Sequence, residues 1–440
     1  MQPHDEHDPG PQDGDIPHIG PNADDERERV RQQLTWPRDS VKVDPDTGVK
    51  RYTKPPLPTL SNLEIIIGQD PAIYPHLGYN EFTGWVTWRG RQIRDEDETT
   101  VNLLVQGLYG VNVATERIRE IAVYIAKQRP WHPVRSWLTR LAWDGTPRLE
   151  KLLSTYAGAA DDALTRAISR KWALGCVARI MEPGCKVDTT LILVGKQGAR
   201  KSSFFAALLP DPAWFSDTAM DLHSKDAYQQ MAGVWIYEVA ELSALRARDA
   251  ESVKAFLTAR VDRFRPPYGR NVVSQPRQVV FVGTTNEAEF LDDPTGARRF
   301  WPVQVGEIDI EAVEADRFQL WAEAAEYYQY GPDRTWWLTE EESASLTETH
   351  GRYERGDPWK DLLHAYLAER TQPVTVLDLM TGPMGMENRD CHKSAQMRVA
   401  GILAAAGWRK VRSQKGNVRR WEWAPPFGGA QPAQPLEPLF

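Results

Sequence analysis

The chain has 440 residues, 41% of them hydrophobic and 26% charged, which is typical of a globular protein with two to three domains. It contains no run of about 18 apolar residues and no basic-then-apolar N-terminal stretch, so we expect a cytoplasmic protein without a membrane span. The net charge of −8 comes mainly from residues 1–29, with nine acids and two arginines, whereas residues 391–423 hold eight bases and one acid. Contact with nucleic acid is therefore not excluded, but it is confined to local basic patches.

The first half of the chain divides by composition. Residues 1–58 are rich in Pro, Asp, Gly and Arg without sustained apolar periodicity, which predicts a disordered acidic tail. Residues 59–150 carry apolar side chains at helical spacing and predict a mostly helical N-terminal region.

The remainder predicts an α/β domain and a small terminal module. Between residues 151 and 335, helical stretches separate the apolar runs 191–194, 234–237 and 279–282, which is typical of strands in a sheet covered on both faces. A polar, Trp-rich connector is predicted at 336–357. Residues 358–424 predict a winged-helix-like basic module with two short helices and a final strand, and 425–440 predict a loose tail.

The first apolar run leads directly into the sequence GKQGARKSS at 195–203. A strand, a Gly-containing loop, Lys-Ser and a helix form the context of a phosphate-binding P-loop, in which Lys201 contacts the β- and γ-phosphates of ATP and Ser202 ligates Mg²⁺. The strict pattern has Gly where this chain has Arg200, which tightens the loop. The alternative is a Gly turn with two surface cations. The candidate nucleotide-binding residues are Gly195, Gln197, Gly198, Arg200, Lys201, Ser202 and Ser203.

Two further strands end in polar residues suited to the same chemistry. Glu238 follows the second run, with Glu241 three residues later, and such carboxylates hold hydrated Mg²⁺ and polarise the attacking water in P-loop ATPases. Asn286 follows the third run, where an amide senses the γ-phosphate or the lytic water. Arg298 and Arg299, in a Gly-containing loop, are candidates for fingers that reach a neighbouring subunit's nucleotide, although an isolated Arg pair is more often a surface feature.

Two segments combine basic and aromatic residues in a way that suits DNA. Arg265, Tyr268 and Arg270 surround a Pro-Pro turn and suit a loop that grips a phosphate backbone and stacks on a base; the alternative is a hairpin whose arginines pair within the fold. The C-terminal candidates for DNA contact are Lys410, Arg412, Arg419 and Arg420.

The order of these features resembles a known family. The segments WIYEVAEL (235–242), FRPPYGR (264–270), GTTN (283–286) and TGARRFWP (295–302), with WHP (131–133), WDG (143–145) and PGCKVD (183–188) upstream, are similar to the virulence-associated protein E family over about residues 100–305. These are P-loop ATPases of phages and genomic islands, related to superfamily 3 helicases. The resemblance implies an AAA+-like core that works as a homo-oligomeric ring, with Lys201 and Ser202 on ATP and Mg²⁺, Glu238 and Glu241 as the carboxylates, Asn286 as the sensor, and Arg298 or Arg299 acting in trans.

Three functions are compatible with this pattern. The first is an ATP-dependent DNA helicase or replication-initiation motor of a bacterial prophage or mobile island, acting on single-stranded DNA or an origin duplex. The second is a nucleotide-gated DNA-binding or loader protein that does not translocate. A primase–helicase fusion is disfavoured, because the acidic run 95–98 is best interpreted as a solvated loop and a separate polypeptide would supply priming.

Overall fold

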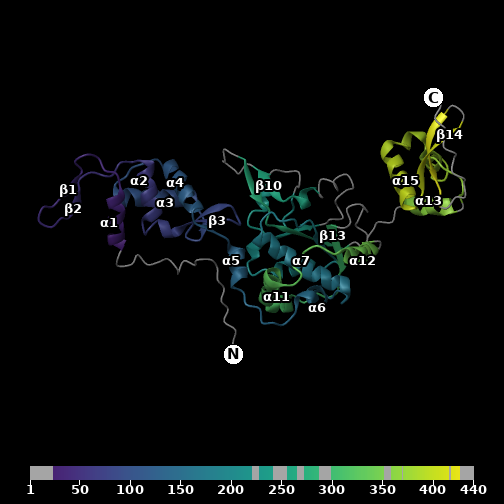
Figure 1. Ribbon diagram of the computed structural model, residues 1–440, viewed down its shortest axis with the longest axis horizontal. Coiled ribbons are helices and arrows are strands. Elements are labelled where there is room, and N and C mark those ends of the chain that lie inside the picture. The colour runs from purple at the N-terminus through teal and green to yellow at the C-terminus, as the bar shows by residue number, and fades with distance from the viewer. Residues whose placement is uncertain are drawn as a thin grey trace, which may run out of the picture. The chain divides into compact units, whose positions relative to one another are not determined.

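The computed structural model describes residues 23–220, 227–240, 255–264, 272–286, 299–350, 358–368, 370–415 and 418–426. The chain forms two compact units, Met1–Tyr353 and Glu354–Phe440 (Figure 1). No helix within these described ranges is long and apolar enough to cross a membrane.

The first unit begins with a region that combines helices and short strands. Strands β5, β4, β3 and β6 form one sheet in that order, and β1 pairs with β2 as a separate ribbon. The elements are α1 (Ala23–Gln33), β1 (Val41–Val43), β2 (Lys50–Tyr52), α2 (Leu60–Gln69), β3 (Leu77–Asn80), β4 (Trp85–Trp88), β5 (Arg91–Gln92), α3 (Asp95–Tyr109), α4 (Thr115–Lys127) and β6 (Pro130–Trp131).

This region differs from the sequence prediction in two respects. Residues 23–58 are not a disordered tail, because Val30 and Leu34 are buried in a core with Leu63 and Ile66 of α2. So few apolar side chains produce no visible periodicity, and the neighbouring helices supply the surface that covers them. The region is also less helical than predicted, because strands of two to four residues are too short to show an alternating pattern.

The acidic run 95–98 is the first turn of α3 and not a solvated loop. Asp97 accepts hydrogen bonds of 2.8 Å from the Arg91 guanidinium and from the Arg94 backbone N–H, and Glu98 accepts one of 2.6 Å from Arg119. Acidic side chains at a helix N-terminus are stabilised by the helix dipole. The run therefore has a structural role.

The rest of the first unit is built on a five-stranded parallel sheet, which confirms the predicted α/β class. The strand order is β13-β7-β12-β9-β8, so the first strand in sequence, β7, lies between two strands that come later in the chain. The strands are β7 (Thr190–Val194), β8 (Phe215–Ser216), β9 (Ile236–Ala240), β12 (Val280–Thr285) and β13 (Phe300–Gln304).

Helices cover this sheet, as the continuous apolar runs predict. On one face Leu191 and Leu193 of β7 share a core with Phe204, Trp172 and Trp321. On the other face Tyr237 and Phe281 belong to a second core. Figure 1 shows α7 and α11 side by side beneath the sheet. The helices of this region are α5 (Pro133–Arg140), α6 (Leu152–Ala157), α7 (Ala163–Met181), α8 (Lys201–Ala207), α9 (Ala227–Gln230), α11 (Ile310–Tyr330) and α12 (Glu340–His350).

In the sequence, a hairpin of β10 (Val261–Phe264) and β11 (Val273–Pro276) comes between β9 and β12, and β10 is labelled in Figure 1. Its base is fixed by a buried ion pair, in which Arg277 Nε lies 3.1 Å from both carboxylate oxygens of Asp262. The Arg277 guanidinium also stacks over the rings of Phe256 and Phe281. The loop that the hairpin carries is therefore attached to a rigid base.

The predicted connector at 336–357 is in part a packed segment of the first unit. Lys171 of α7 is fully buried and donates a hydrogen bond of 2.7 Å to Glu342, and Leu346 is buried in the main core. Trp336 Nε1 donates to the Lys186 carbonyl at 2.7 Å. The polar composition of this segment suggested a linker. The residue that neutralises Glu342 is Lys171, which lies 171 residues away and could not be recognised as its partner from the sequence.

The described residues of the second unit form three α-helices followed by a hairpin. Its core includes Leu363, Leu379, Leu403 and Trp408, and an isolated bridge joins Val374 to Trp423 of the last strand. The sequence predicted two short helices here, and the described residues hold a third; α14 has six residues, too few to show a periodicity. The elements are α13 (Pro358–Ala368), α14 (Val376–Thr381), α15 (Lys393–Ala405), β14 (Arg409–Lys415) and β15 (Val418–Ala424).

Candidate active site

The candidate site lies at the carboxyl edge of the parallel sheet, where loops follow β7, β9 and β12. The loop after β7 begins at Gly195, whose N–H donates to the Thr285 carbonyl at 3.1 Å. A Cβ at Gly195 would lie 2.9 Å from Val305 Cγ2, so only glycine fits between the neighbouring strands. Ligands of open α/β sheets bind at this edge, beside the point where the strand order reverses.

Lys201 opens helix α8 and is 8% exposed. Its ammonium donates to the carbonyls of Gly195 at 2.8 Å and Lys196 at 2.9 Å, and to Asn286 Oδ1 at 2.7 Å. Burial lowers the pKa of Lys201, and the Glu238 carboxylate partly opposes this shift. The structure thus brings together the predicted P-loop lysine and the predicted sensor amide.

Glu238 lies in β9 and is 2% exposed. Its Oε1 accepts hydrogen bonds from Ser202 Oγ at 2.9 Å and from Thr284 Oγ1 at 2.5 Å. Its Oε2 is buried without a hydrogen-bond partner among the described residues. A buried carboxylate oxygen without a partner is costly, so Glu238 Oε2 is suited to a donor or a cation from outside the described residues.

Burial raises the pKa of Glu238, and the hydrogen bonds from Thr284 and Ser202 oppose the shift. The charge of Asp217 raises the pKa further, while Lys201 lowers it. A cation beside Oε2 would favour the ionised form.

These residues fit a magnesium ion. Mg²⁺ prefers oxygen ligands and keeps several of its waters, so it needs only one or two protein groups. The Ser202 hydroxyl and the Glu238 carboxylate provide two such groups, and Glu238 Oε2 has no competing partner in the described part of the chain.

Arg200 adopts a left-handed backbone conformation, with φ 61° and ψ 28°. Glycine adopts this conformation without cost, which explains why the strict P-loop pattern has glycine there. The Arg200 side chain points to an exposed partner, Glu311 of α11, at 3.6 Å. The departure therefore places strain in the backbone of the loop while the lysine stays in place.

The other predicted loop residues have less specific surroundings. Gly198 has φ +82°, a conformation that favours glycine, and nothing lies within 4 Å of a Cβ built there. Gln197 and Ser203 are exposed.

Arg299 lies at the opposite edge of the sheet from the P-loop. It immediately precedes β13, whose first residue Phe300 pairs with Thr190 at the start of β7, whereas the P-loop follows Val194 at its end. Arg299 is half-buried, and its Nε has no hydrogen-bond partner among the described residues.

The remaining predicted residues belong to the second unit or lie outside the described residues. Lys410, Arg412 and Arg420 belong to the hairpin of the second unit, as does the backbone of Arg419. The candidates that lie outside the described residues are Glu241, Arg265, Tyr268, Arg270 and Arg298.

Thr284 is the site residue that the sequence analysis missed. It belongs to the polar run after the apolar part of β12, in which only Asn286 was assigned a role. The signal available in the sequence was its hydroxyl, placed two residues before the sensor at the end of a strand.

Comparison with known proteins supports the resemblance seen in the sequence. Residues 138–355 match the family model of the virulence-associated protein E-like domain. This part of the chain belongs to that family. The match begins and ends later than the 100–305 range expected from the motifs, and no curated protein matches the chain.

Three solved structures are similar in part to this chain. The apo structure of the NrS-1 C-terminal region aligns with a TM-score of 0.47 and 13% identity over 79% of this chain and 95% of the other. The A form apo structure of that region gives a TM-score of 0.45 and 14% identity over 79% of this chain and 96% of the other. A mutant of Thermotoga maritima RuvB gives 0.22 and 12% over 57% and 90%.

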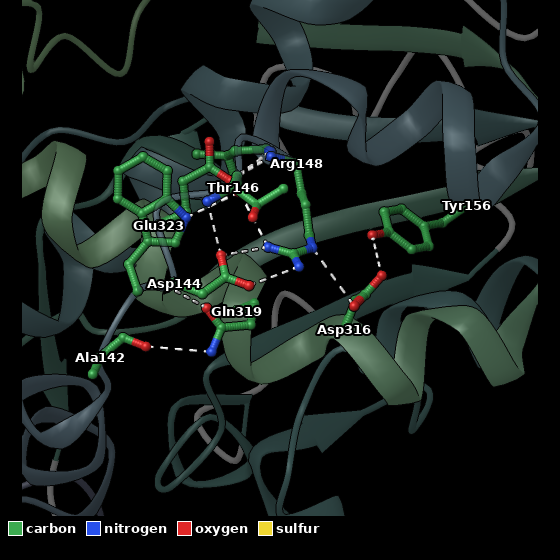
Figure 2. A network of polar contacts seen from close by, with 10 residues as sticks. Ala142, Asp144, Thr146, Arg148, Tyr156, Asp316, Gln319 and Glu323 are labelled. Atoms are coloured by element: carbon green, nitrogen blue, oxygen red, sulfur yellow. Dashed lines mark hydrogen bonds and ion pairs between the residues drawn. The ribbon is translucent and has the colours of Figure 1, made fainter.

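The WDG motif of the virulence-associated protein E-like domain forms a second polar network, shown in Figure 2. The Arg148 guanidinium donates to both carboxylate oxygens of Asp144, at 2.9 and 2.8 Å, and lies 3.6 Å from Asp316 of α11. Glu323 of α11 is 1% exposed and accepts from the backbone N–H groups of Arg148 at 2.6 Å and Leu149 at 2.9 Å. This motif therefore attaches the 142–149 loop to α11.

The WHP motif joins the N-terminal region to the virulence-associated protein E-like domain. His132 is 3% exposed; its Nδ1 accepts from the Arg135 N–H at 3.1 Å and its Nε2 contacts Gln278 Oε1 at 2.5 Å. Gln278 in turn donates to the Glu81 carbonyl at 3.0 Å. Burial lowers the pKa of His132 to about 4. The ring is therefore neutral near pH 7 and acts as a structural connector.

Proposed function

We propose that this chain is an ATP-driven motor that acts on DNA, a helicase or replication-initiation protein encoded by a bacterial prophage or mobile island and working in the cytoplasm. The observation that carries the proposal is the convergence of Lys201, Asn286, Ser202 and Glu238 at one edge of the sheet. Phosphoryl transfer needs a lysine on the phosphates, a hydroxyl and a carboxylate for hydrated Mg²⁺, and a polar group to orient water.

Each of these groups has a defined task in hydrolysis. Lys201 exchanges its carbonyl acceptors for phosphate oxygens, and Asn286, already bonded to it, is positioned near the terminal phosphate. Ser202 and Glu238 would hold Mg²⁺, which would supply positive charge to balance the phosphates. Glu241 is proposed as the second carboxylate.

Subunits are proposed to share their sites in a ring. Arg299 precedes β13, and the nucleotide is proposed to bind at the far end of the neighbouring strand β7. The two ends are separated by about five strand residues of about 3.3 Å each. We therefore propose that Arg299 does not reach the nucleotide of its own subunit. A neighbouring subunit's nucleotide is the proposed target of Arg298 or Arg299.

A mixing experiment tests the shared sites. Neither the Arg298→Ala, Arg299→Ala double variant nor Lys201→Ala should hydrolyse ATP alone, and mixing them should restore activity at interfaces that combine an intact P-loop with an intact finger. If mixed oligomers form without recovery, the arginines act within one subunit or only support the fold.

DNA contact is proposed at two places. The loop with Arg265, Tyr268 and Arg270 joins β10 and β11, whose base is fixed by Arg277 and Asp262.

The second unit is proposed to be a winged-helix module, because its described residues combine three helices with a basic hairpin. Deleting residues 358–440 should weaken DNA binding and flatten its salt dependence while sparing basal ATPase activity. The Arg265→Ala, Arg270→Ala variant should instead lose DNA stimulation of turnover with near-normal binding.

The second candidate, a nucleotide-gated loader that does not translocate, is favoured by the strain at Arg200. The two candidates differ in one measurement, which is ATP-dependent strand separation on a forked substrate at a protein concentration that saturates the DNA. A motor separates strands over many turnovers. A loader binds and releases DNA with nucleotide but separates none. In either case priming is assigned to a separate polypeptide.

A further inference from the structure

The hairpin of β14 and β15 carries an exposed tryptophan between two cations. Trp421 is 57% exposed, with Lys410 Nζ at 5.0 Å and Arg412 Cζ at 5.9 Å from its ring centre. Arg412 is the direct cross-strand partner of Trp421, and Lys410 pairs with Trp423 on the same face. One face of the hairpin thus presents a ring with positive charge on it.

Trp421 is not required by the core of the second unit. Trp423, two residues further on the same face, packs against that core and bridges to Val374. Trp421 extends beyond this contact toward the hairpin tip. The exposed Trp421 ring differs from the other exposed rings of the described residues in having two cations against it, and this combination suits the binding of a flat, negatively charged ligand.

The neighbouring helix α15 carries two exposed cations, Lys393 and Arg398, and the Arg398 guanidinium lies 4.3 Å from the centre of the Trp359 ring. Other exposed positions of α15 include Met397, Gly401 and Ala404, which offer no hydrogen bonds to base edges. Gln396 is already used, since its Nε2 donates to the Cys391 carbonyl at 2.8 Å. In the described part of the hairpin there are four cationic side chains, Arg409, Lys410, Arg412 and Arg420, so the hairpin is more basic than the helix.

We infer that this face of the hairpin binds single-stranded DNA, with an unpaired base stacked on Trp421 and the adjacent phosphates on Lys410 and Arg412. The inference rests on the proposed action on DNA and specifies the form of DNA that the second unit binds. Stacking on an aromatic ring needs a base with a free face, which a duplex does not offer. Such stacking tolerates any base, and nearby cations add the salt-dependent part of the affinity.

The opposite face of the hairpin differs. Arg420, next to Trp421 in the strand and hence on the other face, donates to the buried carboxylate of Glu422 at 2.6 Å. Arg409 is exposed on that same opposite face and pairs across the hairpin with Ala424. Replacing Arg409 removes one charge without touching the ring, so it supplies a matched control.

The test measures the affinity of the full-length protein for a labelled oligo-dT strand and for a blunt duplex of the same length, at two salt concentrations. Trp421→Ala should weaken binding to the single strand about tenfold or more and leave duplex binding within about twofold. Trp421→Phe should recover most of the loss. The Lys410→Gln, Arg412→Gln variant should reduce the salt slope on the single strand, whereas Arg409→Gln should leave it near that of the wild type.

Two results would overturn the inference. One is a Trp421→Ala variant, folded by circular dichroism, that binds the single strand as the wild type does. The other is an equal loss on strand and duplex. Basal ATP hydrolysis without DNA is measured in parallel; its absence in the wild type would contradict the proposed motor while leaving this comparison of affinities interpretable.

Discussion

The virulence-associated protein E-like domain contains two polar clusters, one around Arg148 and one around Glu238. They differ in how many of their carboxylate oxygens accept hydrogen bonds. Around Arg148, both oxygens of Asp144 and the buried Oε2 of Glu323 accept hydrogen bonds (Figure 2). Around Glu238, one carboxylate oxygen has two donors and the other has none in the described part of the chain. A fully paired network stabilises a fold, whereas a buried unpaired oxygen marks a place prepared for a ligand.

Replacement of the site residues should have the largest effect and should separate activity from stability. Lys201→Ala and Glu238→Gln should each reduce ATP turnover at least about a hundredfold, because charge on the phosphates and the metal is no longer balanced. Glu238→Gln should still bind a fluorescent ATP analogue. Steady-state ATPase rates and titration of that analogue measure the two effects.

The melting temperature controls this experiment. Lys201 is buried and bonded to three oxygens, so its replacement is expected to cost some stability, but both variants should remain folded at the assay temperature. Turnover at the wild-type rate in Lys201→Ala would show that the site is misassigned. Loss of nucleotide binding in Glu238→Gln would assign Glu238 to the fold.

The contribution of His132 to the free energy of unfolding should depend on pH. Its pKa of about 4 in the folded chain lies below the ordinary 6.5, so its contribution to stability is complete above pH 6.5, decreases as the pH falls, and is lost below pH 4. The two pKa values correspond to about 3 kcal/mol in the free energy of unfolding. Denaturant titrations between pH 7 and pH 4 measure this loss.

His132→Asn is the matched variant for that measurement. Asparagine still provides an oxygen that caps the first turn of α5, but it has no proton to gain in this range. The decrease in stability on acidification should therefore be smaller in the variant. An identical pH profile in both proteins would assign the acid sensitivity to other groups, such as the carboxylates.

Sequence patterns predicted the site better than its supports. Strand, Gly-containing loop and Lys-Ser is a local pattern, and the structure has a strand, a loop and a helix there, with Ser202 hydrogen-bonded to Glu238 in the middle of β9. The edge on which Arg299 lies depends on the order of strands, which no local window contains. Glu323 and Arg148 are 175 residues apart, so nothing near either residue predicts that they meet.

The paired network around Arg148 should respond to substitution in the opposite way from the site. Glu323→Gln keeps the shape of the side chain but removes the charge that strengthens two backbone hydrogen bonds, so we expect a loss of about 2 kcal/mol in unfolding free energy. Turnover per folded molecule should stay near that of the wild type. Thermal denaturation and ATPase assays well below the melting temperature separate the two quantities; a large loss of turnover with little change in stability would mean that α11 takes part in hydrolysis.

The left-handed backbone conformation of Arg200 places strain in the site itself. Relieving this strain should change stability and turnover less than the preceding substitutions. A left-handed conformation costs a non-glycine residue about 1 kcal/mol, so Arg200→Gly should raise the unfolding free energy by about that amount and preserve or increase turnover. Arg200→Ala separates the causes, because it removes the exposed contact with Glu311 while keeping the backbone cost. Paired measurements of melting temperature and ATPase rate should place the glycine variant above the wild type and the alanine variant near or below it. A large loss of turnover in both variants would show that the Arg200 guanidinium contacts phosphate directly, so that the departure from glycine is part of the nucleotide site and not only strain in the loop.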